Sequence, residues 1–370
     1  MSSNESELVF TISGREVKAD RPESIIKNID LFVYKKQMEP QSAVDALVAG
    51  DSVLIDDYYS SGLTVLKTLK SFLEKKQYDV SFSGQRDFRL VYRELSHRLL
   101  LAITNYKLSV KKAPEIGWLK ILYPELKEFL LPFPQVQGLN SSWQWYAKGI
   151  SIPVLNRKIH PYYGTYFPTR FEHLDLFGKW LKYYKGEKKS AFDIGIGSGV
   201  LSFQLLKKGF EKVYGTDTNP NAIIGLNEDL IATKLYSKIE LVHGDLFANV
   251  NIETELIVFN PPWLPAAHNL SGMDMAVYYD DDLFPRFFAE AKKHLKPNGR
   301  LVILFSNLAQ ITSLSKIHPI EAELSNEERF EKEFFAQTNV APASKKTRRN
   351  QTWRANEVVE LCILKLCNAK

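Results

Sequence analysis

Short apolar segments alternate with stretches of helical periodicity through the second half of the chain. Four segments have the length and composition of buried strands: residues 191–194, 212–217, 239–242 and 256–259. Helical spacing of apolar residues predicts helices over residues 172–184, 200–208 and 283–294. Two later apolar segments, residues 301–305 and 358–366, predict further strands. Strands separated by helices are typical of an α/β fold with a parallel sheet.

The first 140 residues have a different pattern. Residues 9–18 alternate around Ser13-Gly14, which predicts a small hairpin. Helical periodicity predicts helices over residues 25–36, 42–48, 63–76, 87–104 and 118–130. We therefore expect three parts, with Pro132-Phe133-Pro134 near the first boundary: a mainly helical domain over residues 1–140, a hairpin and lid linker over 141–178, and the α/β domain over 179–370.

A glycine-rich turn and a series of polar residues stand at the ends of the predicted strands. Gly195, Gly197 and Gly199 follow the first strand and lead into a helix, so a ligand can approach bare backbone there. Asp217 ends the second strand, 24 residues after Asp193, which is about where a βαβ unit places an acid on a ribose diol. The third strand is followed by Asp245, and the fourth by Asn260, Pro261, Pro262 and Trp263.

This ordered series resembles the class I S-adenosylmethionine-dependent methyltransferases. Asn260-Pro261-Pro262-Trp263 resembles the tetrapeptide of the branch that methylates planar nitrogen, which includes protein-glutamine N5-, adenine N6- and guanine N2-methyltransferases. The resemblance covers about residues 143–370 and implies a Rossmann-like sheet that binds S-adenosyl-L-methionine and releases S-adenosyl-L-homocysteine. A dinucleotide oxidoreductase is the alternative, but it predicts a Gly-x-Gly-x-x-Gly spacing that this turn does not have.

The resemblance implies a role for each residue of the cofactor site. Asp193 is expected near the ammonium of the methionine portion, and Asp217 on the ribose hydroxyls. The adenine is expected to meet Thr218 or Asn219, the Asp245 carboxylate, Leu246 and Phe247. A strand-end turn or a helix cap is the alternative role for Asp245.

The Asn-Pro-Pro-Trp tetrapeptide is expected to bind the methyl acceptor. A planar amino group is a poor nucleophile because its lone pair is delocalised. Hydrogen bonds from that group to the Asn260 side-chain oxygen and the Pro261 carbonyl would favour pyramidalisation and aim the lone pair. The prolines stiffen the turn, and Trp263 can stack on the planar group. Catalysis would then be positioning and electrostatics, without a general base beforehand.

A second hairpin and a lid are predicted before the first strand of the α/β domain. Residues 143–154 alternate around Lys148-Gly149, which predicts a hairpin. Pro168, Arg170 and Glu172 are a looser version of the Pro-Arg-Pro-x-x-Glu stretch of the protein-glutamine methyltransferases, where it covers the cofactor. The resemblance therefore implies a lid whose rings, Tyr163, Tyr166 and Phe167, face the sulfonium. Packing against the helix over residues 172–184 is the alternative for these aromatics.

Two other stretches have competing interpretations. Residues 53–64 resemble the diphosphate-sugar loop of phosphoribosyltransferases, but too few strands precede them, so we expect a loop in which Ser60 or Ser61 caps a helix near Leu63. Residues 345–354 are strongly basic and contain Trp353, which is compatible with phosphate contact, although a solvated loop is the favoured alternative.

Composition limits the function classes. The chain has 370 residues, a formal net charge of +5 and two cysteines, Cys362 and Cys367. No apolar run approaches the roughly 20 residues of a membrane span, and residues 1–8 lack signal-peptide character. We therefore expect a cytoplasmic protein with reduced cysteines and no membrane association, and we predict no metal site.

Three functions remain open. The first is an N-methyltransferase acting on a protein glutamine or a nucleic-acid base, with residues 1–140 recognising the target. The second is a small-molecule methyltransferase or another enzyme that consumes S-adenosylmethionine. The third is a binding module without catalysis, which the intact tetrapeptide disfavours. Salt dependence separates the macromolecular acceptors, because nucleic-acid binding weakens steeply with salt. The pattern leaves the oligomeric state open.

Overall fold

The computed structural model describes residues 7–75, 82–248, 250–266, 276–341 and 356–367. The chain forms two compact units. One consists of Met1–Leu8 and Arg21–Ala147, and the other of Val9–Asp20 and Lys148–Lys370. The hairpin predicted over residues 9–18 is present, but it belongs to the second unit although it precedes the first in sequence. None of the described helices combines the length and the apolar composition that a membrane crossing requires.

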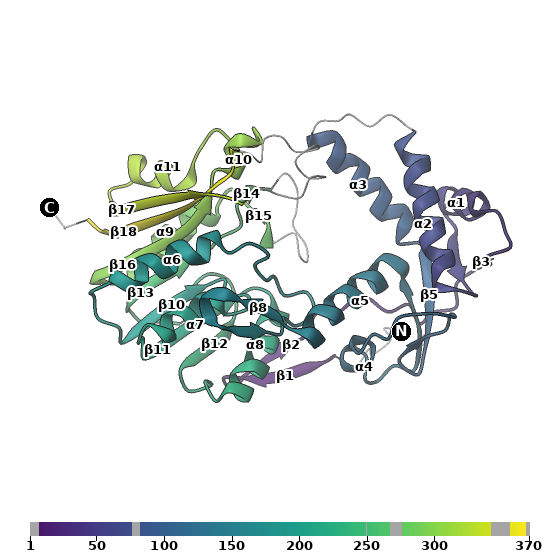
Figure 1. The fold of residues 1–370 in the computed structure, drawn as a ribbon, viewed down its shortest axis with the longest axis horizontal. Helices are drawn as coiled ribbons and strands as arrows, with labels where there is room; N and C mark the ends of the chain where they lie inside the picture. The colour runs from purple at the N-terminus through teal and green to yellow at the C-terminus, as the bar shows by residue number, and fades with distance from the viewer. Residues whose placement is uncertain (1–6, 76–81, 249, 267–275, 342–355, 368–370) are drawn as a thin grey trace. The chain divides into compact units, whose positions relative to one another are not determined.

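A seven-stranded sheet forms the centre of the second unit (Figure 1). Its strands, in spatial order, are β12 (Ile239–His243), β11 (Lys212–Asp217), β10 (Ser190–Ile194), β13 (Thr254–Phe259), β16 (Leu295–Ser306), β18 (Val358–Leu366) and β17 (Phe330–Asn339). The first five are parallel, whereas β18 runs antiparallel to both of its neighbours. The strand order reverses between β10 and β13, and ligands of open α/β sheets bind outside the carboxyl ends of the strands at such a switch point.

The helices of the second unit connect these strands. They are α6 (Glu172–Tyr183), α7 (Val200–Lys207), α8 (Pro220–Thr233), α9 (Leu283–His294), α10 (Leu308–Ile311) and α11 (Pro319–Asn326). Two small hairpins belong to this unit. One pairs β1 (Val9–Ile12) with β2 (Arg15–Lys18). The other pairs β8 (Ile150–Ile152) with β9 (Arg157–Ile159), and the short helix η1 (Pro153–Leu155) lies between these two strands. The short strands β14 (Leu264–Pro265) and β15 (Tyr278–Tyr279) pair in parallel. Every strand and helix predicted for the α/β domain is present.

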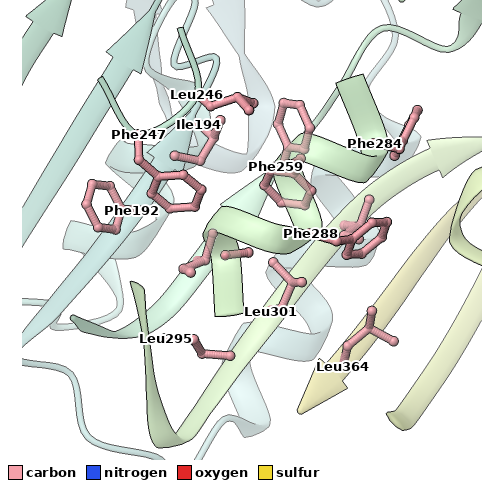
Figure 2. Packing of buried hydrophobic residues seen from close by; sticks show 14 of the residues in the cluster. Phe192, Ile194, Leu246, Phe247, Phe259, Phe284, Phe288, Leu295, Leu301 and Leu364 are labelled. Carbon is pink, nitrogen blue, oxygen red and sulfur yellow. The ribbon is translucent and has the colours of Figure 1, made fainter. Parts of the chain in front are cut away.

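Aromatic rings fill the space between the sheet and α9 (Figure 2). Phe192 and Phe259 project from β10 and β13, and Phe287 of α9 packs against Phe259 with ring centroids 4.3 Å apart. Phe247 meets Phe192 edge-on at 5.0 Å. Truncation of such a buried ring typically costs about 3–5 kcal/mol, so this cluster fixes the strands whose carboxyl ends carry the candidate site.

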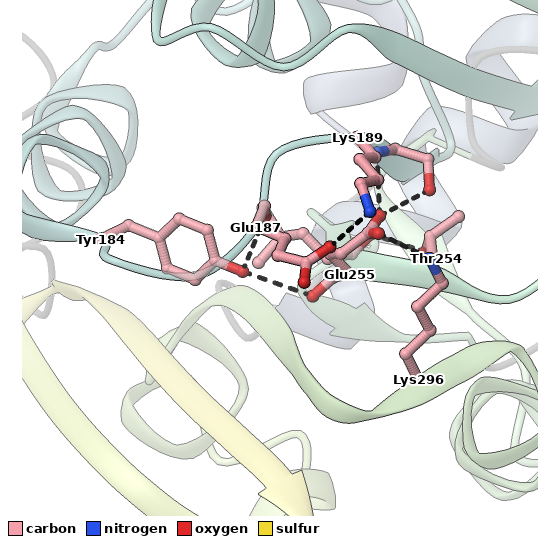
Figure 3. A network of polar contacts seen from close by, with 8 residues as sticks. Tyr184, Glu187, Lys189, Thr254, Glu255 and Lys296 are labelled. Atoms are coloured by element: carbon pink, nitrogen blue, oxygen red, sulfur yellow. Dashed lines mark hydrogen bonds and ion pairs between the residues drawn. The ribbon is translucent and has the colours of Figure 1, made fainter.

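A polar network holds the amino ends of the same strands (Figure 3). Glu255 of β13 is 5% exposed and accepts hydrogen bonds from the backbone N–H and the hydroxyl of Ser190, at 2.8 and 2.7 Å. Lys296 of β16 donates to the same carboxylate at 2.5 Å. Burial opposes ionisation, but these bonds outweigh it and lower the pKa of Glu255. The network is structural, because it lies at the end of the sheet opposite the glycine-rich turn.

Asn221, near the start of α8, joins three segments of the second unit. Its side chain accepts from the backbone N–H of Asp20 at 2.9 Å and donates to the carbonyl oxygens of Asp20 and Tyr163 at 2.7 and 2.8 Å. The residue is 1% exposed. It thereby ties both the amino-terminal hairpin and the segment before α6 to the sheet.

We expect Asn221→Ala to lower the free energy of unfolding by about 2–4 kcal/mol, because it removes the three hydrogen bonds of a buried side chain. Urea denaturation followed by circular dichroism would measure the loss. Asn298→Ala, at an exposed turn of the same unit, is the matched control and should leave the midpoint unchanged. Equal midpoints for the two variants would show that the Asn221 contacts contribute nothing.

The first unit contains a sheet that the sequence pattern does not predict. Its strands are β3 (Leu31–Tyr34), β4 (Ser52–Ile55), β5 (Leu99–Thr104) and β6 (Lys107–Leu108), with β7 (Glu128–Pro132) paired to β5. Its helices are α1 (Pro40–Ala49), α2 (Tyr59–Glu74), α3 (Phe82–Ser96), α4 (Trp118–Leu122) and α5 (Phe133–Lys148). The helices predicted over residues 42–48 and 63–76 are confirmed.

Four predicted elements of this region are wrong. The helix expected over residues 25–36 is replaced by β3, and those over 87–104 and 118–130 stop early and are followed by β5 and β7. Four of the six residues of β5 are buried, and periodicity alone does not distinguish a short buried strand from a buried helix. The hairpin expected over residues 143–154 starts later, because α5 continues to Lys148.

The loop after β4 also differs from its prediction. Helix α2 begins at Tyr59, so Ser60 and Ser61 lie inside it, and no side chain caps its first turn. Asp57 instead accepts hydrogen bonds from the backbone N–H groups of Lys36 and Tyr58, both at 2.6 Å. Burial raises the pKa of Asp57, but these bonds outweigh burial and lower it. The carboxylate therefore organises the loop itself.

Candidate functional site

At two of its three glycines, the glycine-rich turn has no neighbour close enough to exclude a Cβ atom. Gly195 and Gly197 have φ of 65° and 51°, in the left-handed region that favours glycine. A Cβ atom at Gly195 would meet only the Phe259 ring, at 3.8 Å, and one at Gly197 would lie 3.6 Å from the Tyr166 carbonyl oxygen. Glycine is therefore favoured at both positions by the backbone conformation, and the segment containing Tyr166 lies next to Gly197.

Gly199 is the most tightly packed of the three glycines. A Cβ atom there would lie 2.8 Å from Leu226 of α8, closer than packing allows. Gly199 also has φ of 75° and precedes the first residue of α7. Close packing against α8 and the backbone conformation at the start of α7 therefore require glycine here, and a contact with the cofactor stays a prediction.

Asp193 lies under the turn and is 1% exposed. Its Oδ2 accepts from the backbone N–H and the hydroxyl of Ser202, at 2.9 and 2.6 Å, which caps the first turn of α7. Its Oδ1 is buried without a hydrogen-bond partner among the described residues. Burial raises the pKa of Asp193 to about 7, although the bonds from Ser202 lower it. A carboxylate with one unsatisfied buried oxygen can receive a cationic donor.

Asp217 connects the end of β11 to the glycine-rich turn. Its Oδ2 accepts from the backbone N–H of Gly197 and its Oδ1 from that of Asn219, both at 2.8 Å. Burial raises its pKa, and these two bonds act against that rise. Each carboxylate oxygen has a second lone pair, so both can still accept from vicinal hydroxyls. This geometry is compatible with the role predicted for Asp217.

Asn219 is bonded to other parts of the protein. Its Oδ1 accepts from the backbone N–H of Asn221 at 2.9 Å as the N-cap of α8, and its Nδ2 donates to the Gly164 carbonyl oxygen at 2.8 Å. The neighbouring Thr218 is exposed, and its carbonyl oxygen lies 3.1 Å from His243 Nε2. Thr218 is therefore the more accessible of the two residues predicted to line the adenine.

The residues after β12 are divided between surface and core. Asp245 is exposed, and its Oδ2 forms an ion pair with Arg286 of α9. Leu246 is 5% exposed and Phe247 is 1% exposed, both within the hydrophobic cluster of Figure 2. Phe247 stacks on the His294 ring at 4.4 Å, so its side chain packs within this cluster. Arg286 was not predicted to contact this site.

The segment before α6 covers the glycine-rich turn, as the position of the Tyr166 carbonyl oxygen shows. Tyr166 is exposed, and Phe167 is half-buried. Arg170 pairs with Glu357 at 3.0 Å, and its contact with the cofactor stays a prediction. Glu172 accepts from the backbone N–H of Ala341 at 2.7 Å. These two contacts hold the start of α6 against the residues that follow β17 and precede β18.

The Asn-Pro-Pro-Trp tetrapeptide follows β13 at the carboxyl edge of the sheet. Residues 256–259 of β13 pair in register with both β10 and β16, which places Asn260 beside the turn that starts at Gly195. The Asn260 Oδ1 accepts a hydrogen bond from the Trp263 indole N–H at 3.2 Å. Pro261 is buried, and Asn260, Pro262 and Trp263 are half-buried. The tetrapeptide is thus a compact turn that remains partly accessible.

His173, the second residue of α6, is a residue of this site that the sequence pattern did not indicate. Its ring stands perpendicular to the Trp263 indole, with centroids 5.8 Å apart and an interplanar angle of 89°. It is 4% exposed, and its Nδ1 is buried without a partner among the described residues. Burial lowers the pKa of His173 to about 4, although Glu172 acts in the opposite direction. The imidazole is therefore neutral at pH 7.

We expect the stability of the protein to fall with acid partly through His173. The unfolded chain takes up the proton near pH 6.5 and the folded chain only near pH 4, so stability is complete above pH 6.5 and is lost as the pH falls toward 4. The full difference is about 3 kcal/mol. Urea midpoints of His173→Phe should fall less over this range than those of the wild type, whereas an exposed-site control, His160→Gln, should follow the wild type. Parallel curves for wild type and His173→Phe would contradict the prediction.

The groups at the carboxyl edge fit S-adenosylmethionine. Its ammonium group requires an acid, and Asp193 has an unsatisfied buried oxygen. Its ribose requires two acceptors, and Asp217 offers the remaining lone pairs of both oxygens. A cofactor that approaches the backbone closely is favoured by residues without Cβ atoms, and Gly195 and Gly197 are such residues. The basic stretch over residues 345–354 lies outside the described residues.

Comparison with known proteins agrees with this site. Residues 176–333 match the model of the methyltransferase small domain. A protein of Methanocaldococcus jannaschii, provisionally named a protein N5-glutamine methyltransferase, is 30% identical over 142 residues, which cover 36% of this chain and 71% of that protein. A release factor glutamine methyltransferase of Deinococcus radiodurans is 31% identical over 129 residues, 32% of this chain and 45% of that protein. A ribosomal protein L11 methyltransferase of Alkaliphilus metalliredigens is 39% identical over 75 residues, 20% of this chain and 24% of that protein.

The matched residues contain the glycine-rich turn, Asp217, Asp245 and the Asn-Pro-Pro-Trp tetrapeptide. The family model begins within α6 and ends within β17, so it covers the five parallel strands of the sheet and not β18. The chain covers less than half of the two bacterial relatives, and more than two thirds of the archaeal one. On this match, the strand order and the site geometry, the chain belongs to the class I S-adenosylmethionine-dependent methyltransferases.

Proposed function

We propose that the enzyme methylates a planar nitrogen of a macromolecule, and that this nitrogen is the side-chain amide of a protein glutamine. The observation that carries the proposal is the position of Asn260, whose side-chain oxygen stands at the end of β13 next to the strand that leads into the glycine-rich turn. The archaeal relative and the Deinococcus relative are both named as glutamine methyltransferases, which favours the amide over a nucleic-acid base.

Asp193 and Asp217 would hold opposite ends of the cofactor. Asp193, with its pKa near 7, would be shifted toward the ionised form by an ammonium group placed at its free oxygen. Asp217 would bind the ribose and at the same time maintain the turn through Gly197. Thr218 and Asp245 would border the adenine, with Arg286 orienting the Asp245 carboxylate.

The acceptor amide would be bound by the turn after β13. S-adenosylmethionine, when bound, supplies an electrophilic methyl group. The Asn260 side-chain oxygen and the Pro261 carbonyl would accept the two N–H groups of the amide, which favours pyramidal nitrogen and directs its lone pair. Pro261 and Pro262 restrict the backbone, so these acceptors keep one orientation. The rate enhancement would come from orientation and fixed dipoles.

We further propose that the first unit, Arg21–Ala147, recognises the target, and that the enzyme acts in the cytoplasm. The second proposal rests on two cysteines that are both free thiols, Cys362 and Cys367, since disulfides are rare in cytosolic proteins. The roles of the two units can be tested separately. A variant of the first unit that alters the choice of target should leave the affinity for S-adenosylhomocysteine unchanged.

Labelling with the methyl-³H cofactor in a fractionated cell lysate tests the acceptor. We expect the label in protein. Acid hydrolysis should release it as methylamine, as an N5-methylglutamine requires, and amino-acid analysis would detect it. Label in RNA or DNA, with transfer that weakens steeply as salt rises, would replace the glutamine by a base. Label in small molecules alone would show that the acceptor is not a macromolecule.

A further inference from the structure

The side-chain amide of Asn260 has two ends of nearly the same shape and opposite chemistry. The oxygen accepts hydrogen bonds, whereas the NH₂ group only donates them. An acceptor amide that presents N–H groups can bind the oxygen but is repelled by the NH₂ group. The proposed reaction therefore requires that something select one of the two amide orientations of Asn260.

Trp263 supplies that selection. An indole N–H is a donor and has no acceptor capacity, so it can bond to the amide oxygen and not to the amide nitrogen. The Nε1–H of Trp263 donates to Asn260 Oδ1 at 3.2 Å. This bond uses one of the two lone pairs of the oxygen and leaves the other for a ligand. Phenylalanine and tyrosine at the same position would provide a ring without an N–H group.

His173 fixes the indole in turn. It contacts Trp263 with perpendicular rings, and it is almost completely buried in the first turn of α6. That turn is held by the Arg170–Glu357 ion pair and by the Glu172 bond to the Ala341 backbone. The indole therefore packs against a side chain whose own backbone is anchored to the strands β17 and β18.

We propose that Trp263 is a positioning residue whose indole N–H sets the Asn260 amide with its oxygen available to the methyl acceptor, and that His173 holds the indole in that pose. This inference rests on the proposed function for its purpose. The bond itself is a property of the free protein and can be measured without an acceptor, so the two can fail separately.

The direct test uses ¹⁵N-labelled protein without ligands. The Trp263 indole signal is assigned by its loss in Trp263→Phe. In Asn260→Leu, which keeps the size and removes the acceptor, we expect this signal to move upfield and its proton to exchange with solvent about tenfold faster. In Asn260→Asp the signal should stay downfield, because a carboxylate oxygen still accepts. An indole signal that is the same in wild type and Asn260→Leu would overturn the proposal.

The role of His173 is tested by a conservative pair of variants. His173→Ala should speed the exchange of the Trp263 indole proton, whereas His173→Phe, which restores a ring, should return it to the wild-type rate. Equal rates in all three proteins would remove His173 from the proposal.

The consequence for transfer is tested with methyl-³H cofactor and total cell protein as the acceptor pool. Trp263→Phe should reduce the rate of incorporation about tenfold, in line with the loss of one hydrogen bond, while the affinity for S-adenosylhomocysteine changes less than about twofold. Wild-type incorporation by Trp263→Phe would contradict the positioning role. A wild-type enzyme that labels no protein would instead contradict the proposed function and leave the indole measurement intact.

Discussion

Asn260→Ala should reduce methyl transfer by about 100- to 1,000-fold while it leaves the affinity for S-adenosylhomocysteine within a few-fold of the wild type. The substitution removes the side-chain oxygen that is proposed to accept from the methyl acceptor. It leaves Asp193, Asp217 and the glycine-rich turn intact, because among the described residues the Asn260 side chain bonds to Trp263, within the same turn. Removal of one preorganised polar group at a reacting centre typically has an effect of this size.

Initial rates with methyl-³H cofactor and titration calorimetry with S-adenosylhomocysteine measure the two quantities. Asn298→Ala, an exposed asparagine between α9 and the central part of β16, is the matched control and should behave as the wild type. Equal losses of transfer and affinity in Asn260→Ala would show that this residue belongs to the cofactor site, and the division of tasks between β13 and the turn after β10 would be wrong.

Asp217→Asn should weaken binding of S-adenosylhomocysteine by about 100-fold. The carboxylate accepts from the backbone N–H groups of Gly197 and Asn219 with different oxygens. An asparagine has only one oxygen, so its NH₂ group would oppose one of these N–H groups. The variant therefore loses both an acceptor for the ribose and the bond that maintains the turn, and each hydrogen bond to a charged group contributes about 1.5–3 kcal/mol.

Titration calorimetry measures this loss directly, and circular dichroism at the same temperature confirms that the variant is folded. Asp281→Asn, an exposed acid of the same unit, is the control for the change in net charge and should bind normally. An affinity of Asp217→Asn within threefold of the wild type would exclude Asp217 from the cofactor site.

The sequence pattern predicted the second unit well for a physical reason. Parallel strands covered on both faces consist of continuous apolar residues, as in β13, where every residue is buried. Such strands are separated by helices of clear periodicity, and their polar carboxyl ends stand out. The same pattern misses β17, an edge strand in which most residues are exposed and charged residues interrupt the apolar ones.

The first unit was predicted less well because its strands are short and adjoin helices. Residues 87–104 form α3 and β5 with only two residues between them, and nothing in their apolar spacing marks the change. Pairing with β4 and β7 determines that Leu99–Thr104 is a strand. Such pairing partners are distant in sequence, so a local pattern does not contain this information.

The site followed the same division. The predicted site residues lie at the ends of strands or directly after them, so their position in the chain predicts their place at the sheet edge. They are Asp193, Gly195, Gly197, Asp217 and the tetrapeptide. The pairing of Arg170 with Glu357 and the contact of His173 with Trp263 join residues 187 and 90 positions apart. These contacts depend on how α6 packs against the sheet, which no spacing of residues indicates.

Titration of the purified protein with S-adenosylhomocysteine tests the central claim, that a donor with a sulfonium methyl group binds across the carboxyl ends of β10, β11 and β12 and faces Asn260. We expect a saturable heat with one site per chain, weakened by Asp217→Asn and preserved in Asn260→Ala. If neither this product nor S-adenosylmethionine gives a binding heat, the account is contradicted.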